Sequence, residues 1–172
     1  PDVDETPFTP MTFHPFKMFR KKLPDLVYIQ EIPNGIHATV RRLPSGDLDL
    51  MSRGDAVPTC STRIRETLED LVHDAGLYMD VIFEDTDTCH VIDCYCSSTP
   101  DTQFLQRMCA LRVWLSGTYM EIAGIGIVEY IKQDKYDILA DSRRKLVRSP
   151  KSVYIPGKRS KDSLELKAIP VK

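Results

Sequence analysis

The chain has 172 residues, 42% of them apolar, and a formal net charge of −2. This apolar content is sufficient for a globular core, and the length favours a single domain. No apolar run approaches the length of a membrane span, and the polar, acidic first residues are unlike a secretory signal sequence. The chain begins with Pro1 rather than methionine, so we expect a fragment or a processed form.

The cysteines bear on the compartment. Five of them are spread through the chain, at positions 60, 89, 94, 96 and 109. An odd number in a chain of this size favours reduced thiols over a disulfide framework. We therefore expect an intracellular protein, and the sequence leaves the nucleus, the cytoplasm and the mitochondrion open.

The charge is distributed unevenly. Residues 143–172 contain ten Lys or Arg residues and two acidic residues, a net charge of +8, whereas the remaining 142 residues have a net charge of −10. A basic block of this kind indicates a polyanionic partner such as RNA or DNA. The alternative is a solvated tail, or a contact between the block and the acidic remainder of the chain.

In chain order, residues 1–24 come first and are rich in proline and phenylalanine, with basic residues interleaved. Proline is unfavourable inside a regular helix. We expect an extended arm that packs its phenylalanines on the core, followed by one domain over residues 25–172.

The later elements follow from turn signals and hydrophobic periodicity. Two β-rich runs, residues 27–32 and 36–43, flank the turn Pro33-Asn34-Gly35, because proline presets φ and Asn-Gly tolerates positive φ. Further predicted elements are a hairpin over 39–43 and 48–53, a helix over 61–75 capped by Ser61 and ended by Gly76, strands over 77–84 and 89–96, a largely buried helix over 102–116, a β-rich run over 119–130 and a short helical segment over 134–142. Hairpins interleaved with amphipathic helices indicate an α+β fold with antiparallel sheets.

The strand over residues 89–96 is the only candidate for a metal site. Strict alternation places His90, Cys94 and Cys96 on one face of it. Zinc would need a fourth ligand, and the sequence contains no Cys-x2-Cys pair. We therefore expect small buried thiols and no metal.

The stretch from Tyr28 to Val40 resembles the nucleotide-attachment motif of the covalent nucleotidyltransferases, the superfamily of ATP-dependent DNA ligases, RNA ligases and mRNA capping enzymes. That motif reads Lys-x-Asp-Gly-x-Arg, and residues 32–37 read Ile-Pro-Asn-Gly-Ile-His. Gly35 is kept, whereas Ile32 stands in place of the lysine whose amine forms the covalent nucleotide adduct. His37 stands in place of the arginine.

Two further elements resemble ligase motifs in the same order. Arg53 matches the phosphate-contacting arginine of a Ser/Thr-Arg-Asn/Gly element. Asp80 and Asp93 match two aspartates of the next hairpin. In the same hairpin, Ile82 replaces the glutamate that holds the ribose and Ile92 replaces the ring that stacks on the base. An apolar side chain removes the hydrogen-bond acceptor that a sugar site needs.

The last thirty residues carry the closest resemblance. Residues 154–160 read Tyr-Ile-Pro-Gly-Lys-Arg-Ser, against Tyr-x-Pro-Gly-Arg/Lys-Arg/Lys-Ser in ligases. Arg148 lies where a motif lysine sits, Lys167 matches the last motif lysine, and Glu165 replaces the lysine before it. Residues 143–144, both arginine, stand where the metal-associated Glu-Gly belongs.

The resemblance covers residues 10–167, nearly the whole chain. It implies the ATP-grasp-like nucleotidyltransferase domain of DNA ligases, with two antiparallel β-sheets and flanking helices around a central groove. Ligases and capping enzymes continue into an OB-fold after the last lysine motif, and we expect that module to be absent or removed here.

The substitutions suggest what this relative has lost. Because the nucleophile and four supporting positions are replaced together, the resemblance implies a catalytically inactive pseudoenzyme that binds nucleic-acid phosphates, or that serves as a subunit of a larger nucleic-acid-processing complex. The candidate nucleotide or phosphate contacts are Gly35, Arg53, Arg148, Lys158, Arg159 and Lys167. We expect no metal and no covalently bound cofactor; non-covalent binding of ATP or GTP stays open.

Two alternatives remain. An active DNA or RNA ligase, or a capping-type nucleotidyltransferase, would need another nucleophile, for which Lys21 and Lys22 can be proposed, although neither lies at the turn. A purely structural protein would reuse the fold as an assembly subunit, with the arm over residues 1–24 and the basic block docking on protein neighbours.

Overall fold

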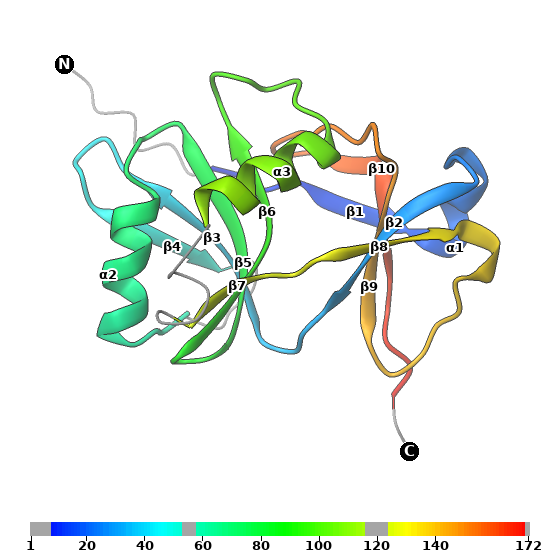
Figure 1. Cartoon of the computed structure of the whole chain (residues 1–172), viewed down its shortest axis with the longest axis horizontal. Coiled ribbons are helices and arrows are strands. Elements are labelled where there is room, and N and C mark those ends of the chain that lie inside the picture. Colours follow the sequence, from blue (N-terminus) through cyan, green and yellow to red (C-terminus); the bar gives the residue numbers. More distant parts are fainter. Residues whose placement is uncertain (1–7, 53–57, 116–123, 171–172) are drawn as a thin grey trace. The chain divides into compact units, whose positions relative to one another are not determined.

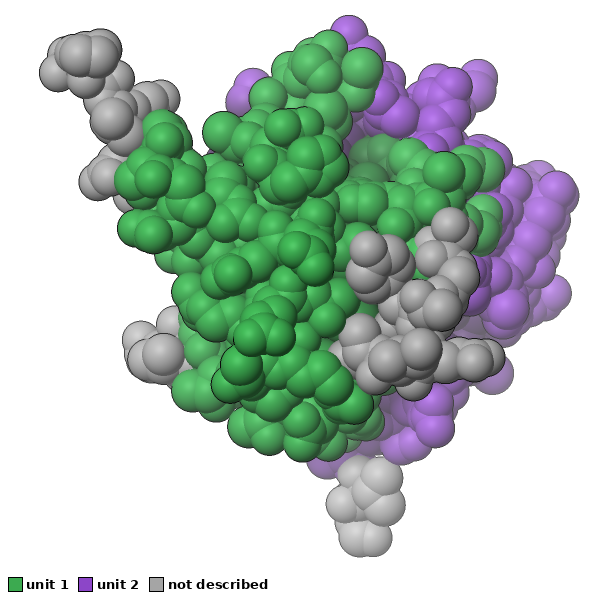
Figure 2. Space-filling view, turned by 60° about the vertical axis from the view of Figure 1, so that its left-hand side comes forward, with its two compact units in different colours: residues 1–7, 34–100, 107–127 green, residues 8–33, 101–106, 128–172 purple. Residues whose placement is uncertain are grey.

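The computed structural model describes residues 8–52, 58–115 and 124–170 (Figure 1). These residues fall into two compact units, which are coloured separately in Figure 2. Within the described part of the chain, unit 1 consists of residues 34–100 and 107–127, and unit 2 of residues 8–33, 101–106 and 128–172. Each unit has its own five-stranded sheet.

Unit 2 is built on a mixed sheet. Its elements are β1 (Thr12–Pro15), β2 (Leu26–Ile32), β8 (Tyr130–Asp134), β9 (Arg144–Arg148), β10 (Arg159–Leu166), the helical turn α1 (Phe16–Phe19) and the 3-10 turns η1 (Arg20–Lys22) and η2 (Lys135–Asp137). The strand order is β1-β10-β9-β2-β8, and only β1 and β10 pair in parallel (Figure 1). The predicted extended arm is thus, over residues 12–22, an edge strand followed by two helical turns.

One face of the unit 2 sheet is covered by an apolar core. Val27 and Ile29 of β2 alternate with polar neighbours, as do Leu164 and Leu166 of β10, so each pair projects to the same side. The buried cluster consists of Phe16, Leu23, Val27, Ile29, Ile138, Val147, Leu164 and Leu166. The opposite face of the same strands therefore carries the intervening polar residues.

Unit 1 is built on a second mixed sheet. Its elements are β3 (Ile36–Arg42), β4 (Leu48–Ser52), β5 (Leu77–Asp85), β6 (Thr88–Cys96), β7 (Ile125–Ile127), α2 (Thr62–Leu71) and most of α3 (Phe104–Trp114). The strand order is β4-β3-β5-β6-β7, with β6 and β7 parallel. The α+β prediction is confirmed, but the sheets are mixed rather than purely antiparallel, because each has one parallel pair at its edge.

Helix α2 begins where the sequence predicts and ends four residues earlier. Its start is fixed by Ser61, whose hydroxyl oxygen accepts a hydrogen bond from the backbone N–H of Ile64 at 3.3 Å. At its other end, Val72 leaves helical geometry. Arg42 donates to the carbonyl oxygens of Glu69 and Val72, at 2.5 and 2.9 Å. A side chain from β3 thus satisfies carbonyls that a helix end leaves without partners.

Three other segments differ from the prediction. The helix expected over residues 102–116 is α3 and is only partly buried: Phe104, Met108 and Leu111 are completely buried, whereas Val113 is 77% exposed. The helix expected over residues 134–142 is reduced to the single 3-10 turn η2. Of the β-rich run expected over residues 119–130, positions 119–123 lie outside the described residues. None of the described helices is both long and apolar enough to cross a membrane.

Candidate functional site

The residues singled out by the resemblance fall in both units. Unit 2 holds Ile32, Arg148, Lys158, Arg159 and Lys167, and unit 1 holds Gly35. Arg53 lies outside the described residues. Unit 2 therefore carries most of the candidate site.

The positions matched to the reaction project from one face of the unit 2 sheet. Ile32 on β2 lies opposite Arg144 on β9, and Arg148 on β9 lies opposite Ser163 on β10. Side chains two residues apart along a strand share a face, which adds Glu165 to the same side as Ser163. We call this the Arg148 face, defined by Ile32, Arg144, Arg148, Ser163 and Glu165.

The position matched to the nucleophile holds a buried hydrocarbon side chain. Ile32 is 3% exposed and offers no amine that could attack a phosphate. Its neighbour Arg144 donates to a carboxylate oxygen of Glu165 at 3.2 Å. The two chemically active side chains nearest to Ile32 on the Arg148 face are thus paired with each other.

The position matched to the metal-binding carboxylate is cationic. Arg143 is exposed and forms an ion pair with Glu31 at 3.3 Å. A divalent metal needs oxygen ligands such as carboxylates, which an arginine cannot supply. Among the residues that the structure describes, no group of three His, Cys, Asp or Glu side chains is arranged to hold a metal ion.

Arg148 is completely buried within unit 2. Its Nε donates to Oε1 of Gln30 at 2.9 Å, and its Nη1 donates to Oγ of Ser163 at 3.5 Å. The rings of Phe13 and Phe104 cover the guanidinium group, with centroids 5.6 and 4.6 Å from Cζ. These contacts give Arg148 a structural role, and a phosphate contact by this side chain stays a prediction.

Lys158 and Arg159 follow a tight turn and are exposed. Gly157 has a φ of +73°, a conformation that favours glycine, and its N–H donates to the carbonyl oxygen of Thr9 at 2.7 Å. The ring of Tyr154 is buried, and its hydroxyl group bonds the same N-terminal segment. The Tyr-x-Pro-Gly segment therefore anchors the N-terminal part of unit 2 and presents two cations to solvent.

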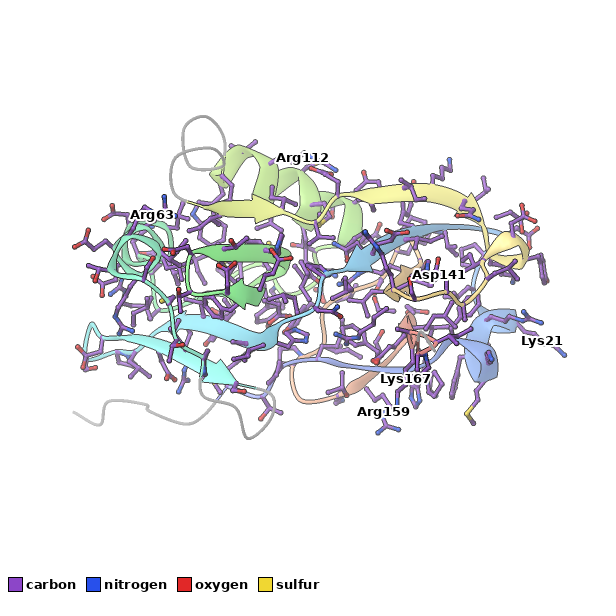
Figure 3. The ribbon with its side chains drawn as sticks, turned by 90° about the horizontal axis from the view of Figure 1, so that it is seen from below. Lys21, Arg63, Arg112, Asp141, Arg159 and Lys167 are labelled. Atoms are coloured by element: carbon purple, nitrogen blue, oxygen red, sulfur yellow. The ribbon has the colours of Figure 1, made fainter. Side chains whose placement is uncertain are left out.

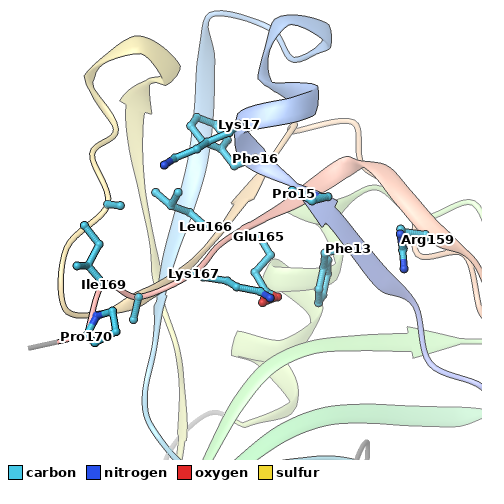
Figure 4. A pocket seen from close by; sticks show the side chains of 12 residues that line it. Phe13, Pro15, Phe16, Lys17, Arg159, Glu165, Leu166, Lys167, Ile169 and Pro170 are labelled. Carbon is cyan, nitrogen blue, oxygen red and sulfur yellow. The ribbon is translucent and has the colours of Figure 1, made fainter.

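Arg159 and Lys167 line a pocket of about 710 Å³. The pocket lies where β1 and α1 meet β10, and Figure 4 shows the side chains around it. Figure 3 shows Arg159 and Lys167 on the same side of unit 2. Two of the predicted phosphate contacts are thus brought together, and Lys17 of α1 joins them in the pocket lining.

In unit 1, Gly35 is explained by packing. It has a φ of +156°, and a Cβ atom added to it would collide with the backbone carbonyl oxygen of Phe83 on β5. Only glycine allows the turn before β3 to approach the neighbouring strand this closely. A phosphate contact at Gly35 stays a prediction.

The two aspartates that match the ligase hairpin are buried and bonded within unit 1. Asp80 and Asp93 are neighbours across β5 and β6. Thr39 donates its hydroxyl hydrogen to Asp80 at 2.8 Å. Arg107 of α3 donates from Nε and Nη2 to the two carboxylate oxygens of Asp93, at 2.8 and 3.1 Å. Both carboxylates are therefore satisfied by protein groups.

The positions matched to the ribose and base contacts are apolar and enclosed. Ile82 is 1% exposed, and Ile92 is fully buried. Ile82 lies opposite His37 on β3, the residue that stands in place of the motif arginine. The two isoleucine side chains offer no acceptor for a sugar hydroxyl group and no aromatic ring for a base.

The predicted arrangement of His90 and the two cysteines on one face of β6 is wrong. His90 lies opposite Ile82 on β5, whereas Cys94 lies opposite Met79, an odd number of residues away. An extra residue, Ile92, is inserted in β6 between these pairs and forms a β-bulge. His90 and Cys94 therefore project from opposite faces.

Sequence reasoning missed Lys17, Gln30 and Arg107. For Arg107 a signal exists, because it follows Phe104 by three residues and so lies on the buried face of α3. A cation on an apolar helix face predicts a buried partner. No local signal indicates that, through the pairing of β1 with β10, Lys17 and Lys167 line the same pocket.

The comparisons with known proteins agree with this architecture. The sequence matches no protein-family model and no curated protein. The solved structure named Pmar-Lig_PreS3 is 14% identical and has a TM-score of 0.72, over 94% of this chain and 47% of its own. An archaeal ATP-dependent RNA ligase, form 1, is 14% identical with a TM-score of 0.54, over 95% and 48% of the two chains. The ligase domain of M. tuberculosis LigD is 13% identical with a TM-score of 0.50, over 92% and 58%.

At this level of identity the likeness shows the fold. The chain has the nucleotidyltransferase fold of ligases, as its motifs predicted. It spans about half the length of the solved chains that it resembles.

Proposed function

We propose that this chain is a catalytically inactive, ligase-like nucleotidyltransferase domain that binds the phosphates of nucleic acid, alone or as a subunit of a larger nucleic-acid-processing complex. The loss of catalysis is supported chiefly by one observation. Ile32, matched to the nucleophile, is buried beside an Arg144–Glu165 ion pair. Removing a covalent nucleophile costs many orders of magnitude in rate, and neither member of this pair is a free amine that could replace it.

Phosphate binding is supported by exposed cations on unit 2. Lys158, Arg159 and Lys167 are all exposed, and no ion pair involves them within the described residues. Cations of this kind bind phosphates with an affinity that falls as salt rises, because bound counterions are released. The lysine and arginine side chains would take the place of those counterions on the phosphates, and no metal is needed.

Covalent labelling tests the loss of catalysis. The purified chain is incubated with α-labelled ATP or GTP and Mg²⁺, denatured and separated on a gel. We expect no label on the chain. A label that survives denaturation would contradict the proposal, and its loss in a Lys21→Gln/Lys22→Gln variant would identify the nucleophile in η1.

Anisotropy measurements test phosphate binding. A labelled oligonucleotide is titrated at several salt concentrations, and a peptide nucleic acid of the same base sequence serves as the phosphate-free control. We expect the oligonucleotide to bind with an affinity whose logarithm falls linearly with the logarithm of salt concentration. The phosphate-free control should not bind. Equal binding of both oligomers, or no oligonucleotide binding at low salt, would contradict phosphate recognition.

A role as a complex subunit is supported by exposed apolar side chains on unit 2. Leu26, Ile131 and Leu139 are 49%, 60% and 77% exposed. A protein partner that covers such side chains would remove their apolar surface from water. Copurification with and without nuclease tests it: a partner retained after nuclease treatment supports a protein contact, and loss of every partner opposes it.

A further inference from the structure

The pocket at the β1–β10 edge of unit 2 is surrounded by cations from two parts of the chain. Lys17 comes from α1, Arg159 is the first residue of β10, and Lys167 directly follows the last. All three are exposed and none has an ion pair among the residues described. The only acidic residue in the lining, Glu165, is already bonded to Arg144 at 3.2 Å. The pocket therefore presents unneutralised positive charge.

An irregularity in β10 brings two of these cations to one pocket. Arg159 lies opposite Thr12 of β1, and Glu165 lies opposite Pro15. Residues 159–165 of β10, which are separated by six steps along the chain, thus run beside residues 12–15 of β1, which are separated by three, because the register shifts between Phe13 and His14. The pairing shortens the distance along the strand from about 20 Å to about 10 Å, at about 3.3 Å per residue.

The resulting spacing suits a chain of phosphates better than a single one. Lys167 lies two residues beyond Glu165, which places its backbone about 17 Å from that of Arg159 along the strand direction. A nucleotide in one strand of a double helix advances only about 3.4 Å, so this distance covers several phosphates. A mononucleotide carries its phosphates at one end and would leave one of the cations unused.

The positive charge at the β1–β10 edge affects the pKa of a neighbouring side chain. The pKa of His14 on β1 is lowered, first by burial and then by the positive charges of Arg159, Lys161 and Lys22. Cations from η1 and β10 therefore lie near His14. Neutral His14 adds no charge of its own at neutral pH.

The wall of the pocket is apolar and partly aromatic. Phe13 and Phe16 line it together with Pro15, Ile169 and Pro170 (Figure 4). The ring of Phe13 is half-buried, and Arg148 lies 5.6 Å from its centroid. Proteins that bind single strands combine such rings, on which bases stack, with cations that follow the backbone.

We propose that this pocket binds a segment of single-stranded nucleic acid, with Lys17, Arg159 and Lys167 contacting separate phosphates along the strand and Phe13 contacting a base. The inference rests on the proposed phosphate binding and assigns it a location and a substrate class. RNA and DNA share this chemistry, and the experiment distinguishes them.

Matched charge-removal variants test the location. Arg159→Gln/Lys167→Gln removes two pocket cations, and Lys132→Gln/Lys151→Gln removes two exposed cations of unit 2 outside the pocket. Anisotropy is measured with labelled single-stranded RNA and DNA of about 12 nucleotides. We expect the pocket variant to bind about tenfold more weakly. The slope of the logarithm of its affinity against the logarithm of salt concentration should be smaller by about 1.4. The control variant should bind within about twofold of the wild type.

A Phe13→Leu variant tests the base contact separately. Loss of stacking on one base should weaken binding about tenfold without changing the salt slope, because no charge is removed. Thermal unfolding of each variant verifies that it is folded. Unchanged affinity of a folded Phe13→Leu variant would overturn the base contact.

The outcomes separate the two proposals. If the wild type binds neither RNA nor DNA at low salt, the proposed function fails and this inference fails with it. If it binds, but both double variants weaken binding equally, phosphate recognition stands and the pocket assignment is overturned. Equal affinity for a duplex of the same length, or for free ATP, would overturn the single-strand assignment.

Discussion

Arg107 of α3 bonds both carboxylate oxygens of Asp93 on β6, and both side chains are almost completely buried, at 3% and 1% exposure. In the ligase motif the matching aspartate belongs to the base- and sugar-binding hairpin. Here its two oxygens are occupied by a protein cation. The carboxylate of Asp93 is therefore bonded within unit 1.

Breaking this pair should be costly. Arg107→Leu leaves Asp93 charged and buried without its cation, and we expect the free energy of unfolding to fall by about 3–5 kcal/mol. Arg63→Leu is the matched control, because its ion pair with Asp87 is exposed and 3.8 Å long; we expect a change below about 1 kcal/mol. Urea unfolding followed by circular dichroism measures both. Equal, small effects in the two variants would show that the buried pair is not structural.

Arg148 should also affect stability rather than nucleic-acid affinity. Arg148→Met keeps the contacts with Phe13 and Phe104 but leaves the Gln30 carbonyl oxygen without its donor. We expect the free energy of unfolding to fall by about 1–3 kcal/mol, the cost of a buried polar group that loses its partner. The affinity of the folded fraction for an oligonucleotide should change less than about twofold.

Lys158→Gln should affect nucleic-acid affinity rather than stability. Lys158 is exposed, so its replacement should leave stability within about 0.5 kcal/mol and weaken phosphate binding. A tenfold loss of affinity in Arg148→Met with unchanged stability would show instead that the guanidinium group contacts phosphate.

Much of the fold could be predicted from local patterns, and the misses share a physical cause. Ser61 marks the start of α2 because its cap acts within one turn. The end of α2 could not be predicted, since it depends on Arg42 from another strand. The bulge at Ile92 reverses the face of the cysteines, and no residue nearby signals it. The order of the motifs gave the candidate residues, but only the pairing of β1 with β10 puts Lys17 and Lys167 in the lining of one pocket.

Replacing Gly35 should cost stability through a steric clash as well as through backbone strain. Gly35→Ala introduces a Cβ atom that collides with the carbonyl oxygen of Phe83, and we expect the free energy of unfolding to fall by about 2–3 kcal/mol. Gly46→Ala is the control, because Gly46 also has positive φ, +97°, but has no atom near the added Cβ. We expect it to cost about 1 kcal/mol, the conformational term alone. An equal loss of unfolding free energy in the two variants would show that the backbone around Gly35 moves to accommodate the Cβ atom at no extra cost.

The cysteines should differ sharply in reactivity. The pKa of Cys96 is lowered, mainly by a hydrogen bond with Ser98, whose Oγ lies 3.0 Å from its Sγ. Burial raises the pKa of Cys89 to about 12 and also raises that of Cys94. The thiolate is the reactive form, so at pH about 8 a larger fraction of Cys96 is ready to react. We expect iodoacetamide to label Cys96 in the native protein and to leave the two buried thiols unmodified.

Ser98→Ala tests the cause of this difference. Without the Ser98 hydroxyl group the pKa of Cys96 should rise, so its alkylation at pH about 8 should slow, while labelling in denaturant stays complete at all five cysteines. Peptide mapping by mass spectrometry gives the rate at each site. Native-state labelling of Cys89 as fast as that of Cys96 would show that the Cys89 side chain is open to solvent. Its burial in unit 1 would then be wrong.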